Sequence, residues 1–217
     1  MGKRLILFAA AVLAVLTAQA RDRQCFDKDW RFILGDSAQM SQVDYNDSFW
    51  RRLDVPHYWA IEGEFYAGNP SGAGGGALPG GIGWYRKHFN LGDCETNMKE
   101  TKFFLEFDGV YMNSTVYVNG QKVGYRPYGY SSFEYDITPY VKEGENVVAV
   151  RVDNSDQPNS RWYSGCGIYR HVWLTKTAPI HVAHWGVYAN SSVTKGKGRL
   201  AIEVSLENLT KGTVPIV

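Results

Sequence analysis

A polar segment near residue 160 carries the residue types best suited to chemistry with sugars. It runs from Asp153 to Arg170 and is called the polar loop below. A pyranose exposes hydroxyl groups on its rim and C–H groups on its faces, so a sugar site combines planar hydrogen-bonding groups with an aromatic ring. Asn159 and Arg161 supply the former, and Trp162 supplies the latter. The alternative is a structural loop in which Arg161 pairs with a nearby acid and Trp162 packs on the core.

A second candidate is the loop from Gly63 to Gly83, called the glycine-rich loop, which contains nine glycines. A phosphate cradle would need a Gly-Lys-Ser/Thr ending, or a G-x-G-x-x-G spacing before a helix. The loop instead leads into the strand-like segment Trp84-Tyr85-Arg86-Lys87. Two interpretations stay open: a flexible surface loop, or a loop that reaches towards a ligand or another domain, as long loops often do.

The histidines do not converge on a shared site. His181 and His184 lie three residues apart in a presumed strand, so their side chains point to opposite faces. His57 follows a proline and precedes two aromatic residues, which fits a buried, hydrogen-bonded side chain at a strand end. No metal centre is predicted from these residues.

The other reactive side chains also lack a catalytic pattern. Widely scattered cysteines without C-x-x-C spacing favour isolated thiols over a zinc site or a disulfide framework; they are Cys25, Cys94 and Cys166. A glycosidase needs two carboxylates that flank the scissile bond. The candidates form no such pair by spacing; they are Glu62, Glu64, Asp108, Glu134, Asp136 and Asp156. We therefore assign no catalytic residue and predict no metal or cofactor.

Composition excludes one class of partner. The 217 residues include 23 basic and 22 acidic side chains, and 44% are hydrophobic. Near-neutrality gives no electrostatic reason to expect a nucleic-acid partner.

The first twenty residues have the pattern of a secretory signal peptide. Lys3 and Arg4 precede an uncharged apolar run from Leu5 to Leu16, and small residues stand at Ala18 and Ala20. The run is too short to span a membrane, which takes about 20 apolar residues. We expect cleavage after Ala20, export to the periplasm or the outside of a bacterial cell, and no membrane attachment afterwards.

The mature chain has the periodicity of strands rather than helices. Apolar residues recur with period two in short bursts bounded by Gly, Pro, Asn and Asp. Asn119-Gly120 is a strong hairpin signal, because both central residues of a type I′ turn need positive φ. The predicted strands lie within residues 30–34, 83–91, 103–107, 114–125, 131–137, 148–152, 168–176, 181–189 and 199–206.

The spacing of these strands predicts a sandwich or jelly roll followed by a second region. A turn-like joint at Thr177-Ala178-Pro179 places the boundary near Pro179. The segment after it supplies two or three strands, too few for an independent sheet. We therefore divide the chain into a leader (1–20), a first domain (21–178) and the beginning of a second (179–217), and expect it to be a fragment of a longer protein.

Eight segments in this order resemble the N-terminal region of glycoside hydrolase family 2, and most closely the exported β-galactosidases of polysaccharide-degrading bacteria. The resemblance covers nearly the whole mature chain. Besides the glycine-rich loop, the segments are Val55–Trp59, Gly83–Phe89, Phe107–Val110, Val116–Gly120, Gly129–Phe133, Asp136–Thr138 and Ser164–Arg170.

The resemblance implies a jelly-roll sugar-binding domain, then an immunoglobulin-like sandwich, then a (β/α)₈ barrel that carries the two glutamates of a retaining mechanism. A barrel needs about 250 residues, so both glutamates are expected beyond Val217. Relatives carry an acidic residue that touches the sugar in a loop matching residues 159–162. Here Asn159, Ser160 and Arg161 occupy those positions, beside Trp162.

Several functions are compatible with that resemblance. The leading one is the N-terminal part of an exo-acting β-galactosidase that is inactive without its barrel. β-Glucuronidase and β-mannosidase relatives share the architecture. A stand-alone carbohydrate-binding module, with Trp162 and Tyr163 as its platform, is the alternative from another class. A third is a scaffold that orients the barrel and contributes to subunit contacts in a homo-oligomer.

Overall fold

The structure is a computed structural model that describes residues 21–92, 100–160 and 162–215. These residues form β-strands and three short 3₁₀ turns without an α-helix, which confirms the all-β prediction. In the same ranges no helix has the length and apolar character needed to cross a membrane. The predicted leader lies outside the described residues. The strands are β1 (Arg21–Cys25), β2 (Trp30–Leu34), β3 (Arg51–Leu53), β4 (Gly81–Leu91), β5 (Lys102–Phe107), β6 (Ser114–Val118), β7 (Gln121–Arg126), β8 (Phe133–Asp136), β9 (Gly144–Asn154), β10 (Val172–Thr177), β11 (Ile180–Thr194) and β12 (Lys197–Asn208).

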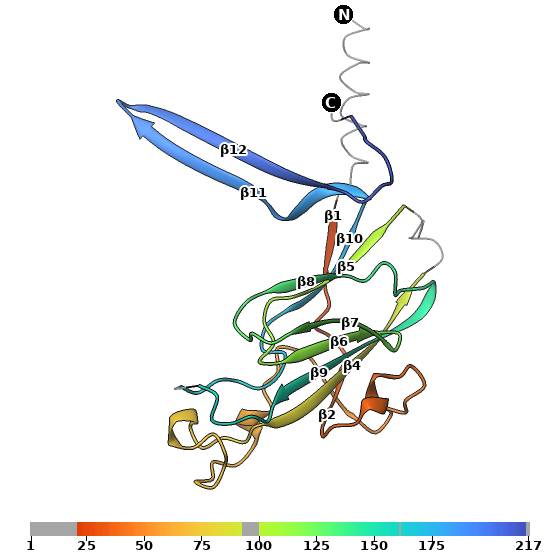
Figure 1. Ribbon diagram of the computed structural model, residues 1–217, viewed down its shortest axis with the longest axis vertical. Helices are drawn as coiled ribbons and strands as arrows, with labels where there is room; N and C mark the ends of the chain where they lie inside the picture. Colours follow the sequence, from red (N-terminus) through yellow and green to blue (C-terminus); the bar gives the residue numbers. More distant parts are fainter. Residues whose placement is uncertain (1–20, 93–99, 161, 216–217) are drawn as a thin grey trace, which may run out of the picture. The chain divides into compact units, whose positions relative to one another are not determined.

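Two sheets make up most of the first compact unit, Arg23–Thr175. The larger has six strands in the order β3-β2-β4-β9-β6-β7, and the smaller has four in the order β1-β10-β5-β8 (Figure 1). Neighbouring strands of the larger sheet run antiparallel. Consecutive strands are often not neighbours, because the chain crosses repeatedly between the two layers of this sandwich.

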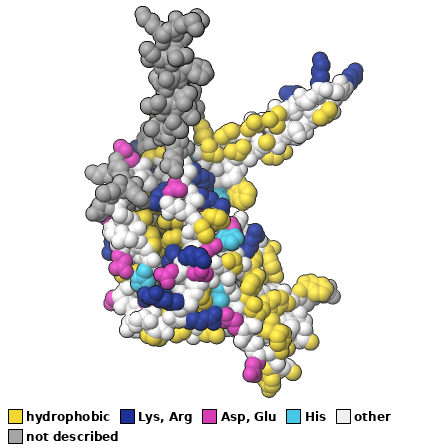
Figure 2. All heavy atoms as spheres, turned by 180° about the vertical axis from the view of Figure 1, so that it is seen from behind, with side chains coloured by type: hydrophobic (Ala, Val, Ile, Leu, Met, Phe, Trp, Pro, Cys, Tyr) yellow, Lys and Arg dark blue, Asp and Glu magenta, His cyan; other side chains and the backbone are white. Residues whose placement is uncertain are grey.

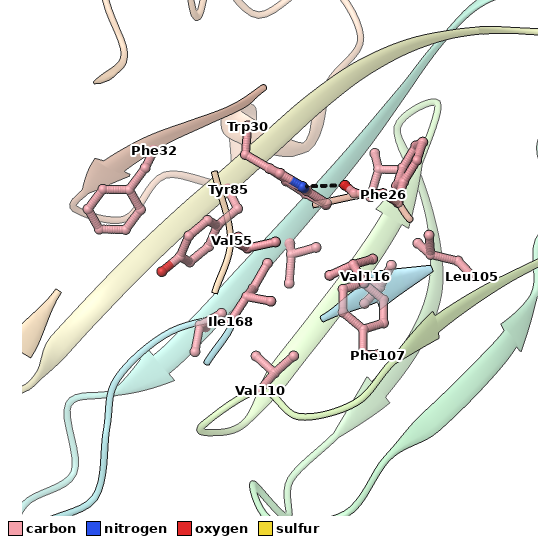
Figure 3. Close-up of a cluster of buried hydrophobic side chains, with 14 of the residues drawn as sticks. Phe26, Trp30, Phe32, Val55, Tyr85, Leu105, Phe107, Val110, Val116 and Ile168 are labelled. Atoms are coloured by element: carbon pink, nitrogen blue, oxygen red, sulfur yellow. Dashed lines mark hydrogen bonds between the residues drawn. The ribbon is translucent and has the colours of Figure 1, made fainter. Parts of the chain in front are cut away.

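The core lies between the two sheets (Figure 3). Alternate residues of each strand point inward, as the period-two pattern predicts. Trp30 sits in this layer with its indole Nε1 donating to the Phe26 carbonyl at 2.9 Å, so the Trp30 donor is paired despite its burial. Fully buried members from the two sheets include Trp30, Tyr85, Phe103, Leu105, Phe107, Val116, Val118, Val148, Val150 and Val152.

The central strand β4 is buried on both faces, although the alternation suggested a single core face. Tyr85 points to the main core, while Trp84 and Arg86 point the other way and are also buried. The chain between β2 and β3 covers this second face. It includes a 3₁₀ turn, η1 (Ala38–Ser41), and Met40 accepts a hydrogen bond from Arg86 Nη1 at 2.6 Å.

The predicted hairpin at Asn119-Gly120 is confirmed. Asn119 and Gly120 have φ values of 50° and 79° and connect β6 to β7, as a type I′ turn requires. The strand predicted at 30–34 coincides with β2, and the others overlap observed strands. The short strands β1 and β3 were not predicted.

The second unit contains the hairpin β11–β12, an antiparallel pair with a register shift between Val182 and Val187. Two strands form this sheet. The assignment of this segment to an immunoglobulin-like domain stays a prediction. Large apolar side chains on the hairpin are exposed, namely Val187, Tyr188, Val193, Leu200, Ile202, Val204 and Leu206.

Candidate functional site

The polar loop leaves β9 and returns to β10 at one end of the sandwich, where the glycine-rich loop also lies (Figure 1). Backbone bonds hold its closing half in place. Gly167 and Tyr111 exchange two bonds, with N···O distances of 3.0 and 2.9 Å, and His57 N donates to Ile168 O at 2.8 Å. The loop is therefore built into the fold.

Two glycines of the polar loop are required by close contacts. A Cβ at Gly165 would lie 1.9 Å from Tyr58 Cε1. Gly167 has φ +125°, and a Cβ there would lie 2.3 Å from Tyr85 Oη and 2.6 Å from His57 O. Only glycine combines that φ with so close an approach of backbone to neighbours.

The side chain of Asn159 makes hydrogen bonds within the loop and to Tyr111. Its Nδ2 donates to Asn154 Oδ1 at 2.6 Å and to Asp156 O at 2.8 Å, and its Oδ1 accepts from Tyr111 Oη at 3.2 Å. Both amide hydrogens are thereby engaged. Asn159 thus shapes the loop, and any sugar contact from it would have to use the remaining acceptor capacity of Oδ1.

Ser160 and Ser164 hold the tip of the loop. Their hydroxyls are 2.9 Å apart, Ser160 Oγ bonds to both the carbonyl and the N–H of Trp162, and Ser164 Oγ is 2.9 Å from Tyr130 Oη. The Trp162 side chain itself is 74% exposed. The ring therefore does not pack on the core, and a fixed backbone presents it to solvent. Arg161 lies outside the described residues, so its sugar contact stays a prediction.

Tyrosines from separate segments surround the loop, and sequence reasoning did not select them as a group. Tyr58 and Tyr169 have ring centroids 5.9 Å apart. Tyr111 and Tyr130 meet edge to face at 5.2 Å. Burial raises the pKa of Tyr111 and of Tyr169, so both remain neutral phenols that can donate hydrogen bonds. Tyr58, Tyr130 and Tyr169 lie in three of the family-like segments, and Tyr111 directly follows a fourth, Phe107–Val110.

The glycine-rich loop lies directly beside the polar loop. A Cβ at Gly80 would lie 2.5 Å from the Asn154 carbonyl. Phe65 and Tyr66 on this loop are exposed. The hydrophobic side chains of both loops belong to the apolar surface at this end of the sandwich (Figure 2). This position fits a loop that reaches towards a ligand, the second interpretation of its sequence.

A series of polar contacts runs from the buried Tyr85 and His57 to the exposed Glu62 and Arg51. His57 Nδ1 is 2.8 Å from Tyr85 Oη, and His57 Nε2 is 3.3 Å from Glu62 Oε1. Arg51 binds both oxygens of Glu62, at 2.6 and 2.7 Å. Burial lowers the pKa of His57, so the imidazole is neutral at neutral pH. His57 is thus the buried, hydrogen-bonded histidine that the sequence suggested.

Other reactive groups in the described residues take part in structural contacts. Asp108 accepts from the Trp173 indole at 3.1 Å, and Asp136 accepts from the Thr138 N–H at 2.8 Å. Cys25 and Cys166 are free thiols, and burial raises the pKa of Cys166. Cys94 lies outside the described residues. These contacts give Asp108 and Asp136 structural roles.

Comparison with known proteins identifies the family of the domain that carries this site. Residues 77–178 match the family model described as glycosyl hydrolases family 2, sugar binding domain. Beta-galactosidase BoGH2A of Bacteroides ovatus is 58% identical over 190 residues, 87% of this chain and 22% of that protein. A putative β-glucuronidase of Formosa agariphila is 41% identical over 212 residues, 97% of this chain and 20% of that protein.

Solved structures agree with these matches. A β-glycosidase from Bacteroides vulgatus superposes with a TM-score of 0.83 at 41% identity, covering 88% of this chain and 25% of that one. A family 2 member from Bacteroides cellulosilyticus gives 0.79 at 38% identity, covering 85% and 24%. The sandwich is therefore the predicted jelly-roll sugar-binding domain. The chain spans about a fifth to a quarter of the length of the relatives it matches.

Proposed function

Because this chain is the N-terminal sugar-binding part of a family 2 glycosyl hydrolase, we propose that its polar loop contacts the sugar cleaved by an exo-acting, retaining β-galactosidase. Trp162 provides the apolar platform in this proposal. Asn159 and Ser160 act mainly by holding the loop in shape. The catalytic glutamates belong to a barrel outside residues 1–217.

The exposed Trp162 ring is the observation that carries the proposal. An exposed indole leaves a large apolar surface in contact with water. A sugar face that binds on the ring covers this surface, which is favourable. The hydroxyls of Ser160 and Ser164 bond to the backbone of Trp162 and hold it. A platform held in this way loses little conformational freedom when a ligand binds.

The similarity to known enzymes favours galactose as the terminal sugar. The β-galactosidase relative shares 58% of aligned residues, against 41% for the putative β-glucuronidase. A β-glucuronidase remains the second candidate, because that match extends over 97% of this chain. Assays of the complete hydrolase with both glycosides would discriminate the two.

The substitution Trp162→Ala is expected to weaken binding of β-galactosides by about tenfold, equal to about 1.4 kcal/mol. The loss follows from removal of the ring that covers the apolar sugar face. Isothermal titration calorimetry of the purified chain with β-galactoside oligomers measures it. Trp185→Ala is the matched control, because Trp185 is 80% exposed and lies on β11 in the other unit. Equal affinities for wild type and Trp162→Ala would contradict the proposal.

The chain by itself is expected to show no turnover of chromogenic β-galactosides. The reason is the proposed location of both glutamates in a barrel that these residues do not include. The assay is release of the chromophore after purification away from host glycosidases. Turnover that survives this purification would contradict the missing active site.

The leader expected at residues 1–20 supports export to the periplasm or the outside of a bacterial cell. Detection of a mature protein that begins at Arg21 would test this location. A stand-alone carbohydrate-binding module is the competing function. Saturable binding by the chain, lost in Trp162→Ala, combined with a reading frame that has no barrel would favour the module.

A further inference from the structure

Two further exposed tyrosines lie next to the polar loop, on the connection between β7 and β8. Tyr128 is 60% exposed and Tyr130 is 54% exposed. Their ring centroids are 5.8 Å apart with an interplanar angle of 63°. Clustered exposed rings of this size mark interaction surfaces more often than isolated ones do.

The connection that carries these rings is fixed from several sides. Tyr169 Oη donates to the Gly129 carbonyl at 2.8 Å. Gly129 lies so close to the Tyr111 ring that a Cβ would be 2.3 Å from its Cδ2. Tyr130 also meets Tyr111 edge to face. The rings of Tyr128 and Tyr130 are therefore presented on a backbone that contacts hold in place, as a preformed binding surface requires.

Hydrogen bonds connect Tyr130 to the backbone of Trp162. Tyr130 Oη is 2.9 Å from Ser164 Oγ, and Ser164 Oγ is 2.9 Å from Ser160 Oγ, which accepts from the Trp162 N–H. These contacts involve hydroxyl and backbone groups and no charged side chain. Exposed aromatic faces beside hydroxyl groups suit a polyhydroxylated ligand.

We propose that Tyr128 and Tyr130 form a second sugar platform beside Trp162, so that the ligand is a β-linked oligosaccharide rather than a single galactose. This inference rests on the proposed function of the Trp162 platform. The rings of Tyr128 and Tyr130 are inclined to each other and cannot both lie flat on one sugar face. In this proposal the two tyrosine rings contact a sugar unit next to the one that covers Trp162. A longer oligosaccharide therefore buries more apolar surface on the protein.

The test compares affinity for β-linked galacto-oligosaccharides of one and three units, measured by calorimetry on the purified chain. Wild type is expected to bind the trisaccharide about fivefold more tightly than the monosaccharide, since each additional buried apolar contact adds affinity. Tyr128→Ala is expected to bring this ratio to about one. Tyr188→Ala is the control, because Tyr188 is 61% exposed on β11 and should keep the wild-type ratio.

The outcomes separate this inference from the proposed function. A ratio near one in wild type, or an undiminished ratio in Tyr128→Ala, overturns the second platform alone when Trp162→Ala still loses affinity for both sugars. No binding by wild type, or no effect of Trp162→Ala, overturns the proposed function and the second platform with it. Circular dichroism melting of each variant checks that the exposed substitutions leave the fold intact. A protein partner on these rings would leave the ratio near one, which also overturns the inference.

Discussion

Replacing Asp47 with alanine is expected to lower the free energy of unfolding by about 3–5 kcal/mol, because it leaves a fully buried guanidinium without its counter-ion. Arg86 is buried on the outer face of β4, and its Nε donates to Asp47 Oδ2 at 2.7 Å. Arg31 also binds Asp47, and His88 Nε2 lies 2.9 Å from the same Oδ2. One carboxylate therefore pairs with two guanidinium groups and also contacts an imidazole.

The protonation behaviour of Asp47 supports this expectation. Burial raises the pKa of its carboxyl, but the hydrogen bonds and electrostatic attraction from His88 and Arg86 together outweigh burial, and the pKa lies below its ordinary value of 3.8. A lowered folded-state pKa means that the contribution of Asp47 to stability is complete above pH 3.8. It is lost as the pH falls through the folded-state pKa.

Denaturant unfolding monitored by tryptophan fluorescence measures the loss. Asp54→Ala is the matched control, because Asp54 pairs with the exposed Lys28 at 2.6 Å. Exposed ion pairs contribute little to stability. If the two variants unfold at the same denaturant concentration, Asp47 does not hold the buried arginine as the geometry indicates.

The Asp47–Arg86 contact also shows where sequence patterns reach their limit. Strand β2 and the β6–β7 hairpin could be predicted because their signals are local: alternation in residues 30–34 and the turn residues Asn119 and Gly120. Asp47 and Arg86 are 39 residues apart, and the sequence around either residue gives no indication that the two will pair. Strand β3 was missed for a related reason, since its three residues include Arg51 and Arg52 and show no apolar alternation.

In the candidate site, too, some features could be predicted from the sequence and others could not. The exposed position of Trp162 agrees with the sugar-platform interpretation of the polar loop, which rested on residue types alone. The tyrosine surroundings could not be predicted, because Tyr58, Tyr111, Tyr130 and Tyr169 come from four segments that only the fold brings together. Likewise, spacing could not show that the amide of Asn159 is turned inward.

Gly167→Ala is expected to have the largest effect of any single methyl added to the site, lowering the free energy of unfolding by about 2–6 kcal/mol. Part of the cost is backbone strain at φ +125°, which side chains other than hydrogen disfavour. The rest is overlap, because the new Cβ would meet Tyr85 Oη at 2.3 Å and His57 O at 2.6 Å. Tyr85 is fully buried and His57 O belongs to the backbone, so neither atom can move aside freely.

Gly76→Ala separates overlap from strain. Gly76 lies in the glycine-rich loop at φ +76°, and a Cβ there would find only Leu78 Cδ1, at 4.0 Å. Its cost should therefore be about 1–2 kcal/mol, the left-handed conformation alone. Equal unfolding midpoints for the Gly167→Ala and Gly76→Ala variants would contradict the close packing at Gly167.

The Gly167→Ala variant also tests whether the close packing at Gly167 affects sugar binding. Gly167 exchanges two backbone bonds with Tyr111, and Tyr111 in turn donates to Asn159. A displaced Gly167 should therefore shift the loop that presents Trp162, even at temperatures where the sandwich remains folded. Calorimetry with β-galactoside oligomers on folded Gly167→Ala protein is expected to show an affinity loss of at least about tenfold, comparable to that of Trp162→Ala. Wild-type affinity in that variant would mean that the ring binds sugar independently of the scaffold beneath it.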